Sequence, residues 1–114
     1  ILSRHAYTSS IVEMRDQRKF LHLKSGIAYL EGRRFVGARE LQRLCGIDDE
    51  EFLAVADEEG YAANCIRVND RVLIAAGYPA IAQSLAARGY QIEALDLSEF
   101  RKMDGGLSCL SLRF

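Results

Sequence analysis

The sequence predicts an α/β fold built from repeated strand-strand-helix-strand units, and two observations carry this prediction. The same hairpin pattern, two short apolar strands around a two-residue polar turn, occurs twice in the chain. Each hairpin pattern is followed by a helical stretch that stops at a glycine, and then by another short apolar strand. A repeat of about 20 to 50 residues is typical of architectures whose units cover one another's apolar faces.

The first unit is expected at about residues 26–56. Its strands are rich in β-branched and aromatic side chains, and a glycine in the turn suits the tight reversal that a hairpin needs. The glycine that follows the helical stretch is a common helix terminator. The expected elements are strands 27–30 and 33–36 around Glu31-Gly32, a helix from Ala38 to Leu44 ended by Gly46, and strand 52–55.

The second unit is expected at about residues 64–97 and has the same order of elements. Its turn has an Asn-Asp pair, two residues that tolerate the backbone conformations of tight turns. Proline opens its helical stretch, the position at which a missing N–H costs nothing. The expected elements are strands 65–68 and 71–74 around Asn69-Asp70, a helix from Pro79 to Arg88 ended by Gly89, and strand 91–95.

The end of the chain is expected to form a further strand over residues 107–114 that pairs with a neighbouring sheet. Residues 1–114 together are expected to make one part of a single catalytic domain rather than several domains. Two units on their own would leave sheet edges and apolar faces uncovered. We therefore expect a missing segment of the same protein, or a second copy in a homodimer, to cover them.

Composition and charge exclude several classes of function. The net charge of −1 and the pI near 6.1 give no reason to expect a nucleic-acid partner or an anionic membrane surface. No long apolar run predicts a membrane span, and the first residues do not read as a secretion signal. The three cysteines are an odd number without metal-ligand spacing, which predicts no disulfide framework, no metal site and a reducing, cytoplasmic setting.

Cys109 is the candidate for chemistry in the last eleven residues. It follows Gly105-Gly106 at the head of an apolar segment, and a glycine step allows the backbone to approach a ligand closely. Cysteine attacks as the thiolate, so a reactive cysteine needs an open and electropositive setting. The pattern alone also fits a small buried core residue. Cys65 and Cys45 are expected to be inert, Cys65 as a buried core thiol.

The chain resembles a known family, the bacterial dimethylarginine dimethylaminohydrolases of the guanidino-group modifying, or amidinotransferase, superfamily. The resemblance extends over nearly the whole chain in the order and spacing of the family, and it corresponds to the C-terminal part of a member about twice as long. The N-terminal half would then be absent. The segments that carry it are Leu21-His22-Leu23-Lys24, Tyr61-Ala62-Ala63-Asn64-Cys65-Ile66, Val68-Asn69, Ala76-Gly77-Tyr78-Pro79, and Phe100 to Gly106 running into Ser108-Cys109.

The resemblance implies a five-bladed α/β propeller with its active site in the central channel, of which this chain supplies about two blades. It also implies that Cys109 is the nucleophile and His22 the general acid and base. Met103 matches the position whose backbone carbonyl binds the α-amino group of the substrate. Lys24 stands where arginine deiminases and amidinotransferases have an aspartate, and lysine there is similar to the dimethylarginine hydrolases. No cofactor is implied.

The implied reaction is the hydrolysis of Nω-methylated arginine to citrulline and a methylamine. A guanidinium remains protonated at all working pH values, so its carbon is electron-poor and open to attack by a thiolate. A histidine near neutral pKa can protonate the leaving amine and then deprotonate water, which releases the covalent thiouronium intermediate. On its own, His22 between two leucines also fits a structural residue of a half-buried strand.

Two other functions remain open from the sequence. Another guanidino-modifying enzyme, an arginine deiminase or amidinotransferase, would use the same cysteine and histidine on a different substrate. A non-catalytic interaction protein with a propeller fold would contain both residues by chance, since fold alone does not decide function.

Overall fold

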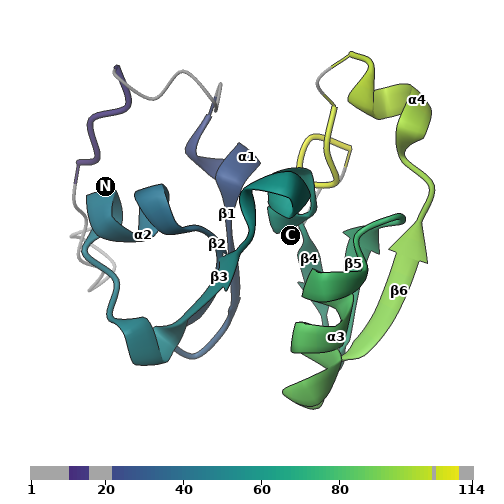
Figure 1. The fold of residues 1–114 in the computed structure, drawn as a ribbon, viewed down its shortest axis with the longest axis horizontal. Coiled ribbons are helices and arrows are strands. Elements are labelled where there is room, and N and C mark those ends of the chain that lie inside the picture. The colour runs from purple at the N-terminus through teal and green to yellow at the C-terminus, as the bar shows by residue number, and fades with distance from the viewer. Residues whose placement is uncertain (1–10, 16–21, 104, 111–114) are drawn as a thin grey trace, which may run out of the picture.

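The computed structural model describes residues 11–15, 22–103 and 105–110. Two three-stranded sheets lie side by side, with strand orders β1-β2-β3 and β4-β5-β6 (Figure 1). In each sheet the first pair of strands is antiparallel and the second pair is parallel. A parallel pair requires a crossover connection, and a helix supplies it in both units. The repeat of strand, strand, helix and strand is confirmed.

The first sheet has a register in which Val36 of the central strand faces Ala28 on one side and Leu53 on the other. Central strands buried on both faces are rich in apolar side chains, and Val36 is fully buried. The elements are α1 (Leu23–Gly26), β1 (Ile27–Glu31), β2 (Arg34–Ala38), α2 (Arg39–Cys45), η2 (Asp49–Glu51) and β3 (Phe52–Val55).

The second sheet repeats this plan with α3 as its crossover helix. Val72 of the central strand faces Arg67 and Ile92 and is also fully buried. The elements are η3 (Asp57–Ala63), β4 (Ile66–Val68), β5 (Arg71–Ala75), α3 (Pro79–Ala87), β6 (Gln91–Leu95) and α4 (Ser98–Arg101).

The first hairpin differs from the expectation by one residue. The turn is Gly32-Arg33 rather than Glu31-Gly32, because Glu31 still pairs with Arg34 at the end of β1. Gly32 has a φ of +55°, a conformation that glycine adopts without a Cβ clash. The shift leaves the Glu31 side chain on the strand, where it contacts the second unit.

The two acidic runs of the chain, at residues 49–51 and 57–59, lie in short helices. Asp49–Glu51 and Asp57–Ala63 form 3₁₀ helices, η2 and η3. Glu59 of η3 accepts the backbone N–H groups of Ala80 and Ile81 at 3.0 and 2.7 Å. These amides begin α3 and have no partner inside the helix, so a side chain from η3 caps the crossover helix of the second sheet.

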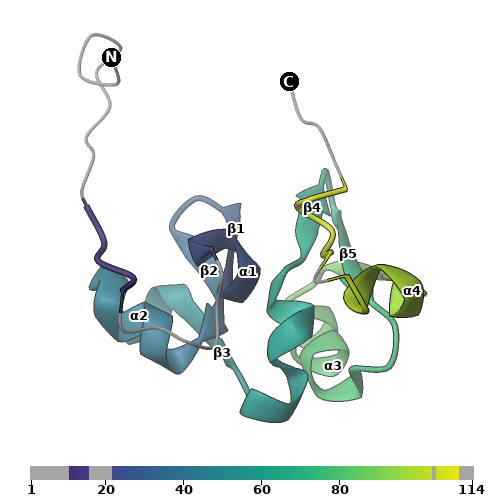
Figure 2. The same ribbon diagram turned by 90° about the horizontal axis from the view of Figure 1, so that it is seen from above.

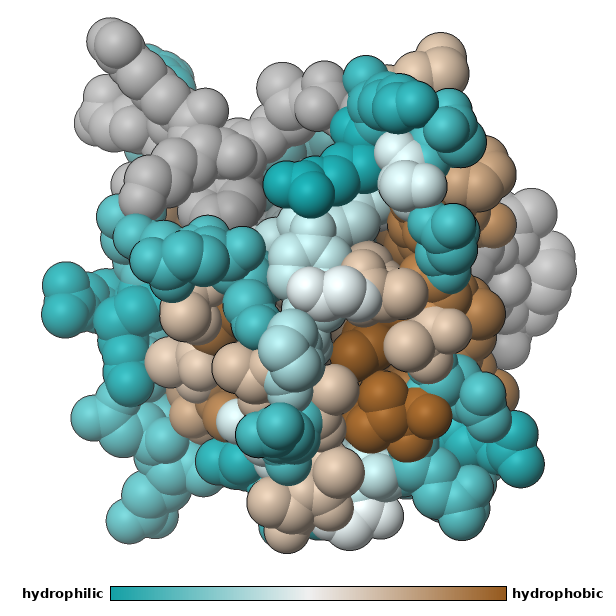
Figure 3. All heavy atoms as spheres, turned by 45° about the vertical axis from the view of Figure 1, so that its right-hand side comes forward, coloured by the Kyte–Doolittle hydropathy of each residue, from teal (hydrophilic) through white to brown (hydrophobic). Residues whose placement is uncertain are grey.

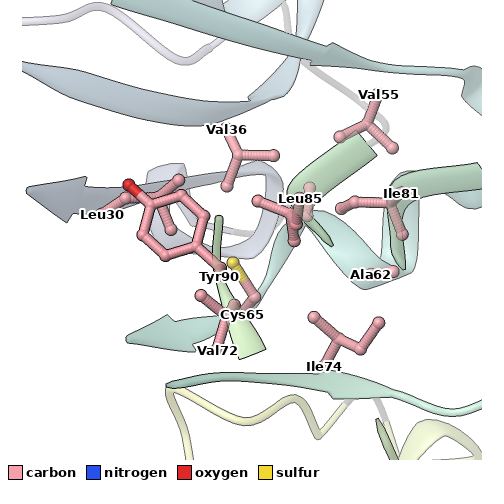
Figure 4. Close-up of a cluster of buried hydrophobic side chains, with 11 residues drawn as sticks. Leu30, Val36, Val55, Ala62, Cys65, Val72, Ile74, Ile81, Leu85 and Tyr90 are labelled. Carbon is pink, nitrogen blue, oxygen red and sulfur yellow. The ribbon is translucent and has the colours of Figure 1, made fainter. Parts of the chain in front are cut away.

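One hydrophobic core joins the two units. Tyr90 and Cys65 of the second unit lie beside Leu30 and Val36 of the first, and Ala62 of η3 is in the same cluster (Figure 4). Because side chains of both sheets share this core, the units form one body rather than two separate lobes. Its other buried members are Val55, Ala63, Val72, Ile74, Ile81 and Leu85.

Candidate active site

Cys109 lies in a tight turn and not at the head of a strand. Its backbone N–H donates to the carbonyl of Gly106 at 3.0 Å, and the N–H of Leu110 reaches the same carbonyl at 3.2 Å. The strand expected over 107–114 is therefore wrong for residues 107–110, which form a turn and a bend. Residues 111–114 lie outside the described residues. The turn leaves Cys109 exposed, as a nucleophile must be.

The turn is held from outside by η3 and the residue that follows it. The Tyr61 hydroxyl donates to the Gly105 carbonyl at 2.6 Å. The side-chain oxygen of Asn64 accepts the backbone N–H of Ser108 at 2.9 Å. Both bonds join residues 44 positions apart in the sequence. The loop that carries Cys109 is thus attached to the body of the second unit at two points.

His22 is exposed and precedes a short helix, which corrects the expectation of a half-buried strand. It is the N-cap of α1, with φ −137° and ψ 153°, and its carbonyl accepts the N–H of Ser25 at 3.0 Å. Lys24 lies on the same helix and is also exposed. Helix α1 packs against η3. The segment that holds the Cys109 turn is therefore also the neighbour of the helix that begins at His22.

Met103 is on the approach to the same turn. Its backbone N–H and that of Gly105 both donate to the carbonyl of Phe100, at 3.0 and 2.8 Å. The Met103 side chain is 86% exposed, so it does not pack in the core.

Tyr61 lies among charged and aromatic neighbours. The Arg101 guanidinium is 5.2 Å from the centroid of its ring, and the Tyr78 ring centroid is 5.9 Å away. Burial is the main cause that raises the pKa of Tyr61, and the charges of Tyr78 and Cys109 act in the same direction, while Arg101 opposes them. Tyr61 therefore remains a hydroxyl donor through neutral pH, within electrostatic range of the Cys109 sulfur.

A surface pocket of about 410 Å³ lies beside this tyrosine, and Tyr78, Ser98 and Arg101 also line it. Cys109 and His22 are not among the described residues that line it. It is therefore not the cleft in which these two residues would meet a substrate.

The other two cysteines are separated from this chemistry. Cys65 is 5% exposed in the shared core, which confirms it as a buried core thiol, and burial raises its pKa to about 12 (Figure 4). Burial also raises the pKa of Cys45, which is partly exposed at the end of α2. All three cysteines are free. Of the three, Cys109 is the exposed thiol, Cys45 is partly exposed and Cys65 is buried.

The described residues show neither a cluster of metal ligands nor a helix that could span a membrane. No three histidine, cysteine, aspartate or glutamate side chains in the described ranges come close enough together to hold a metal ion. Within the same ranges, no helix has the length and apolar character needed to cross a membrane.

Sequence reasoning missed Tyr61 and Asn64, the two residues that hold the Cys109 turn. A signal was present for Asn64, because a lone amide in the apolar run 62–66 must find a hydrogen-bond partner once it is buried. Asn64 is 6% exposed. Its partner could not be identified from the sequence, because a contact over 44 positions depends on how the two loops meet.

The paired sheets with helical crossovers form an α/β fold, in which η3 contacts α1 and, with Asn64, holds the Cys109 turn. The chain is homologous over its whole length to the bacterial dimethylarginine dimethylaminohydrolases. It is 45% identical over 114 residues to the N(G),N(G)-dimethylarginine dimethylaminohydrolase of Pseudomonas aeruginosa. The aligned residues make up 100% of this chain and 44% of that protein. The chain therefore spans less than half the length of this curated relative. No family model matches the chain.

Two solved structures support the same assignment of the fold. A cysteine-to-serine variant of the Pseudomonas aeruginosa enzyme, complexed with citrulline, superposes with a TM-score of 0.79 at 40% identity, over 98% of this chain and 43% of that chain. A histidine-to-glycine variant of dimethylarginine dimethylaminohydrolase, an adduct with S-methyl-L-thiocitrulline, superposes with a TM-score of 0.86 at 43% identity over the same shares. The fold is that of these enzymes, and the two repeated units form part of their propeller.

Proposed function

We propose that this chain carries the nucleophile and the general acid/base of a hydrolase that converts Nω-methylated arginine to citrulline and a methylamine. The observation that carries the proposal is the exposed Cys109, presented on a turn fixed to η3 in a chain 45% identical to a dimethylarginine dimethylaminohydrolase. In this proposal Cys109 is the nucleophile, and His22 transfers the protons.

The proposed reaction has two halves. The Cys109 thiolate adds to the guanidinium carbon, and His22 protonates the methylamine as the carbon-nitrogen bond breaks, which leaves a thiouronium on the sulfur. His22 then removes a proton from water, the hydroxide adds to the same carbon, and the carbon-sulfur bond breaks to return the thiolate and citrulline. Both residues are exposed, as groups that meet a substrate from solution must be.

The relatives support this pairing of roles. One of the two solved structures has a replaced cysteine and the other a replaced histidine. The sequence separation of these two positions equals that of Cys109 and His22 in this chain. One variant holds citrulline and the other an adduct with a thiocitrulline. A product and a sulfur analogue of citrulline fit a reaction at the guanidino carbon.

We further propose that the Met103 carbonyl binds the α-amino group of the substrate. Lys24 would also rule out guanidinium binding by an aspartate at that position, as in arginine deiminases and amidinotransferases. Met103 lies just before the Gly105-Gly106 step, so its backbone is close in sequence to the nucleophile. An exposed lysine at the start of α1 cannot pair with a guanidinium, because both groups are cations.

The rest of the substrate pocket would come from a segment of the same protein outside this chain. The exposed large apolar side chains of the second sheet and the residues that follow it are Val68, Leu95, Phe100 and Leu110, and Figure 3 shows brown apolar patches on the side of the molecule that carries β6. Such a surface needs a cover. We propose that the missing segment, rather than a second copy in a homodimer, covers this surface, and that the chain alone does not turn over substrate. We also propose that the protein is cytoplasmic, where its three free cysteines would stay reduced.

The test is a chimera in which this chain replaces the matched segment of the Pseudomonas aeruginosa enzyme. It should release citrulline from asymmetric dimethylarginine and from monomethylarginine, and more slowly from arginine. Cys109→Ser and His22→Ala should each abolish detectable turnover, because one loses the nucleophile and the other the proton shuttle. Cys45→Ser is the matched control and should keep the activity of the chimera.

Three outcomes would contradict the proposal. Preference for arginine would favour an arginine deiminase, and transfer of the amidino group to an amine would favour an amidinotransferase. A folded chimera without turnover, in which Cys109 reacts no faster with thiol reagents than a free cysteine does, would favour a non-catalytic interaction protein.

A further inference from the structure

We infer that Asn64 and Tyr61 are positioning residues that together set the place of the Cys109 thiol. The inference rests on the proposed function, since a position matters for catalysis only if Cys109 is the nucleophile. Neither side chain is expected to touch the reacting atoms. Both act through the backbone of residues 105–108, the segment that leads into Cys109.

Asn64 acts on the peptide group that joins Leu107 to Ser108, one peptide group before the nucleophile. Its side-chain oxygen accepts the N–H of Ser108, the residue next to Cys109, at 2.9 Å. The amide is 6% exposed, so water does not compete well for this bond. The other N–H groups of the turn donate within it, from Cys109 and Leu110 to Gly106. Asn64 therefore supplies the bond that ties this turn to the rest of the protein at Ser108.

The Asn64 side chain is also in direct contact with the turn at Gly106. A Cβ built on Gly106 would lie 2.8 Å from Cγ of Asn64 and closer still to its Nδ2 atom. Only a residue without a side chain leaves room for this approach. The amide thus fixes the turn both by a hydrogen bond and by close packing, which limits the movement of the Cys109 backbone toward or away from η3.

Tyr61 holds the beginning of the same segment. Its hydroxyl donates to the Gly105 carbonyl at 2.6 Å. The ring itself is restrained by Tyr78 and by the Arg101 guanidinium, which lies over it at 5.2 Å from the centroid. A restrained ring loses little freedom when its hydroxyl binds, so this bond can hold the loop in one position.

The two anchors belong to one segment that also contacts the histidine side of the site. Asn64 is the C-cap of η3, and η3 packs against α1, which His22 precedes. A shift of the cysteine turn relative to η3 would therefore also be a shift relative to His22. A displacement of about 1 Å in a reacting group can cost about a hundredfold in rate. Asn64 and Tyr61 would prevent that displacement.

The test uses Asn64→Ala and Tyr61→Phe in the chimera described above. Asn64→Ala should raise the hydrogen-exchange rate of the Ser108 amide by tenfold or more, because this N–H loses its acceptor. With dimethylarginine, kcat should fall by about ten- to a hundredfold for Asn64→Ala and about tenfold for Tyr61→Phe, and KM should stay within about threefold. Because a smaller folded fraction would also lower the apparent kcat without changing KM, kcat is calculated per folded molecule, with the folded fraction measured by circular dichroism.

The structure offers matched controls for both changes. Gln42→Ala removes the other buried side-chain amide of the described residues, and Tyr90→Phe removes a hydroxyl that donates to Glu31 rather than to the cysteine turn. Both controls should keep kcat within about twofold of the unmodified chimera and should not change exchange at Ser108.

The inference is overturned if Ser108 exchanges at the unmodified rate in Asn64→Ala, or if both variants keep kcat in an active chimera. If Asn64→Ala does not fold, Tyr61→Phe decides through kcat, because it retains the packed ring. If the unmodified chimera has no turnover, the proposed function fails. The positioning role of Asn64 is then judged from hydrogen exchange at Ser108 and from the rate at which iodoacetamide modifies Cys109. This modification rate should change at least threefold in Asn64→Ala and not in Gln42→Ala.

Discussion

The Tyr90 hydroxyl donates a hydrogen bond to the Glu31 carboxylate at 2.8 Å, and so joins residues 59 positions apart. Glu31 is the last residue of β1 in the first unit, and Tyr90 directly precedes β6 in the second. The other carboxylate oxygen accepts from Arg67 of β4 at 2.9 Å. One carboxylate at the end of a hairpin strand therefore links the two sheets that Figure 2 shows side by side.

We expect Glu31→Ala to lower the free energy of unfolding by about 1–3 kcal/mol. Tyr90 and Arg67 would lose their shared acceptor, and the Nε atom of Arg67 is already buried without a partner. The measurement is urea unfolding followed by circular dichroism. The control is Glu93→Ala, which breaks a pair with Arg71 at 2.8 Å whose side chains are 49% and 57% exposed, and which should cost at most about 1 kcal/mol. Equal losses of unfolding free energy in the two variants would show that the contacts of Glu31 between the units stabilise the fold no more than an exposed ion pair does.

Glu59→Ala should destabilise the start of α3. The carboxylate accepts the N–H groups of Ala80 and Ile81, and the loss of such a capping side chain costs about 0.5–2 kcal/mol. Thermal unfolding measures the effect on the whole chain, and hydrogen exchange at Ile81 locates it. Glu58→Ala removes the preceding, exposed carboxylate of η3. An effect as large in that control would assign the loss to net charge instead of capping.

Iodoacetamide at pH 8 should modify Cys109 and leave Cys65 unmodified in the folded protein. Cys109 is exposed, whereas Cys65 is buried and keeps its proton because burial raises its pKa to about 12. Peptide mass spectrometry after a timed reaction distinguishes the two sites. In urea both thiols should react, which tests that folding protects Cys65. Fast modification of Cys65 in the folded state would mean that the core opens at that point.

The free energy of unfolding should fall as the pH rises above the ordinary pKa of a thiol, partly because of Cys65. The unfolded chain releases this proton near pH 9.0, but the folded chain retains it until about pH 12. The raised folded pKa therefore contributes stability that is complete below pH 9.0. It is lost by about 1.4 kcal/mol for each pH unit between these values. Tyr61 and Tyr90, whose pKa values are also raised by burial, add to the same trend.

Comparison with Cys65→Ala isolates the contribution of the thiol. The substitution removes a buried sulfur and should lower stability at pH 7, but both tyrosines remain in the variant. The difference in free energy of unfolding between the two proteins should narrow from pH 9 to pH 11. Parallel curves over that range would show that the Cys65 proton is not linked to folding.

Much of the fold could be predicted from the sequence because it depends on local patterns. Strands β3 and β6 have the predicted bounds, and both helices end before the predicted glycines, Gly46 and Gly89. Apolar alternation, a proline at the start of a helix and a glycine at its end act within a few residues of each other, so they can be read along the chain. The one-residue error at Gly32-Arg33 is also local, since either pair of residues suits a turn.

The candidate site was predictable only in part. The sequence and its family resemblance singled out Cys109 and His22 as the candidate pair, and they remain proposals. The sequence did not indicate that Cys109 lies on a turn, that His22 precedes a helix, or that a short 3₁₀ helix lies next to both elements.

What the sequence by itself determined is the repeated unit of strand, strand, helix and strand and the residues able to do chemistry, because periodicity and residue type are properties of neighbours along the chain. What only the tertiary structure decided is the set of partners: Asn64 for Ser108, Tyr61 for Gly105 and Glu31 for Tyr90. Each pair joins residues at least 44 positions apart. Such contacts exist only after the two sheets have packed on their shared core, since packing brings these polar groups together and removes the water that would otherwise satisfy them.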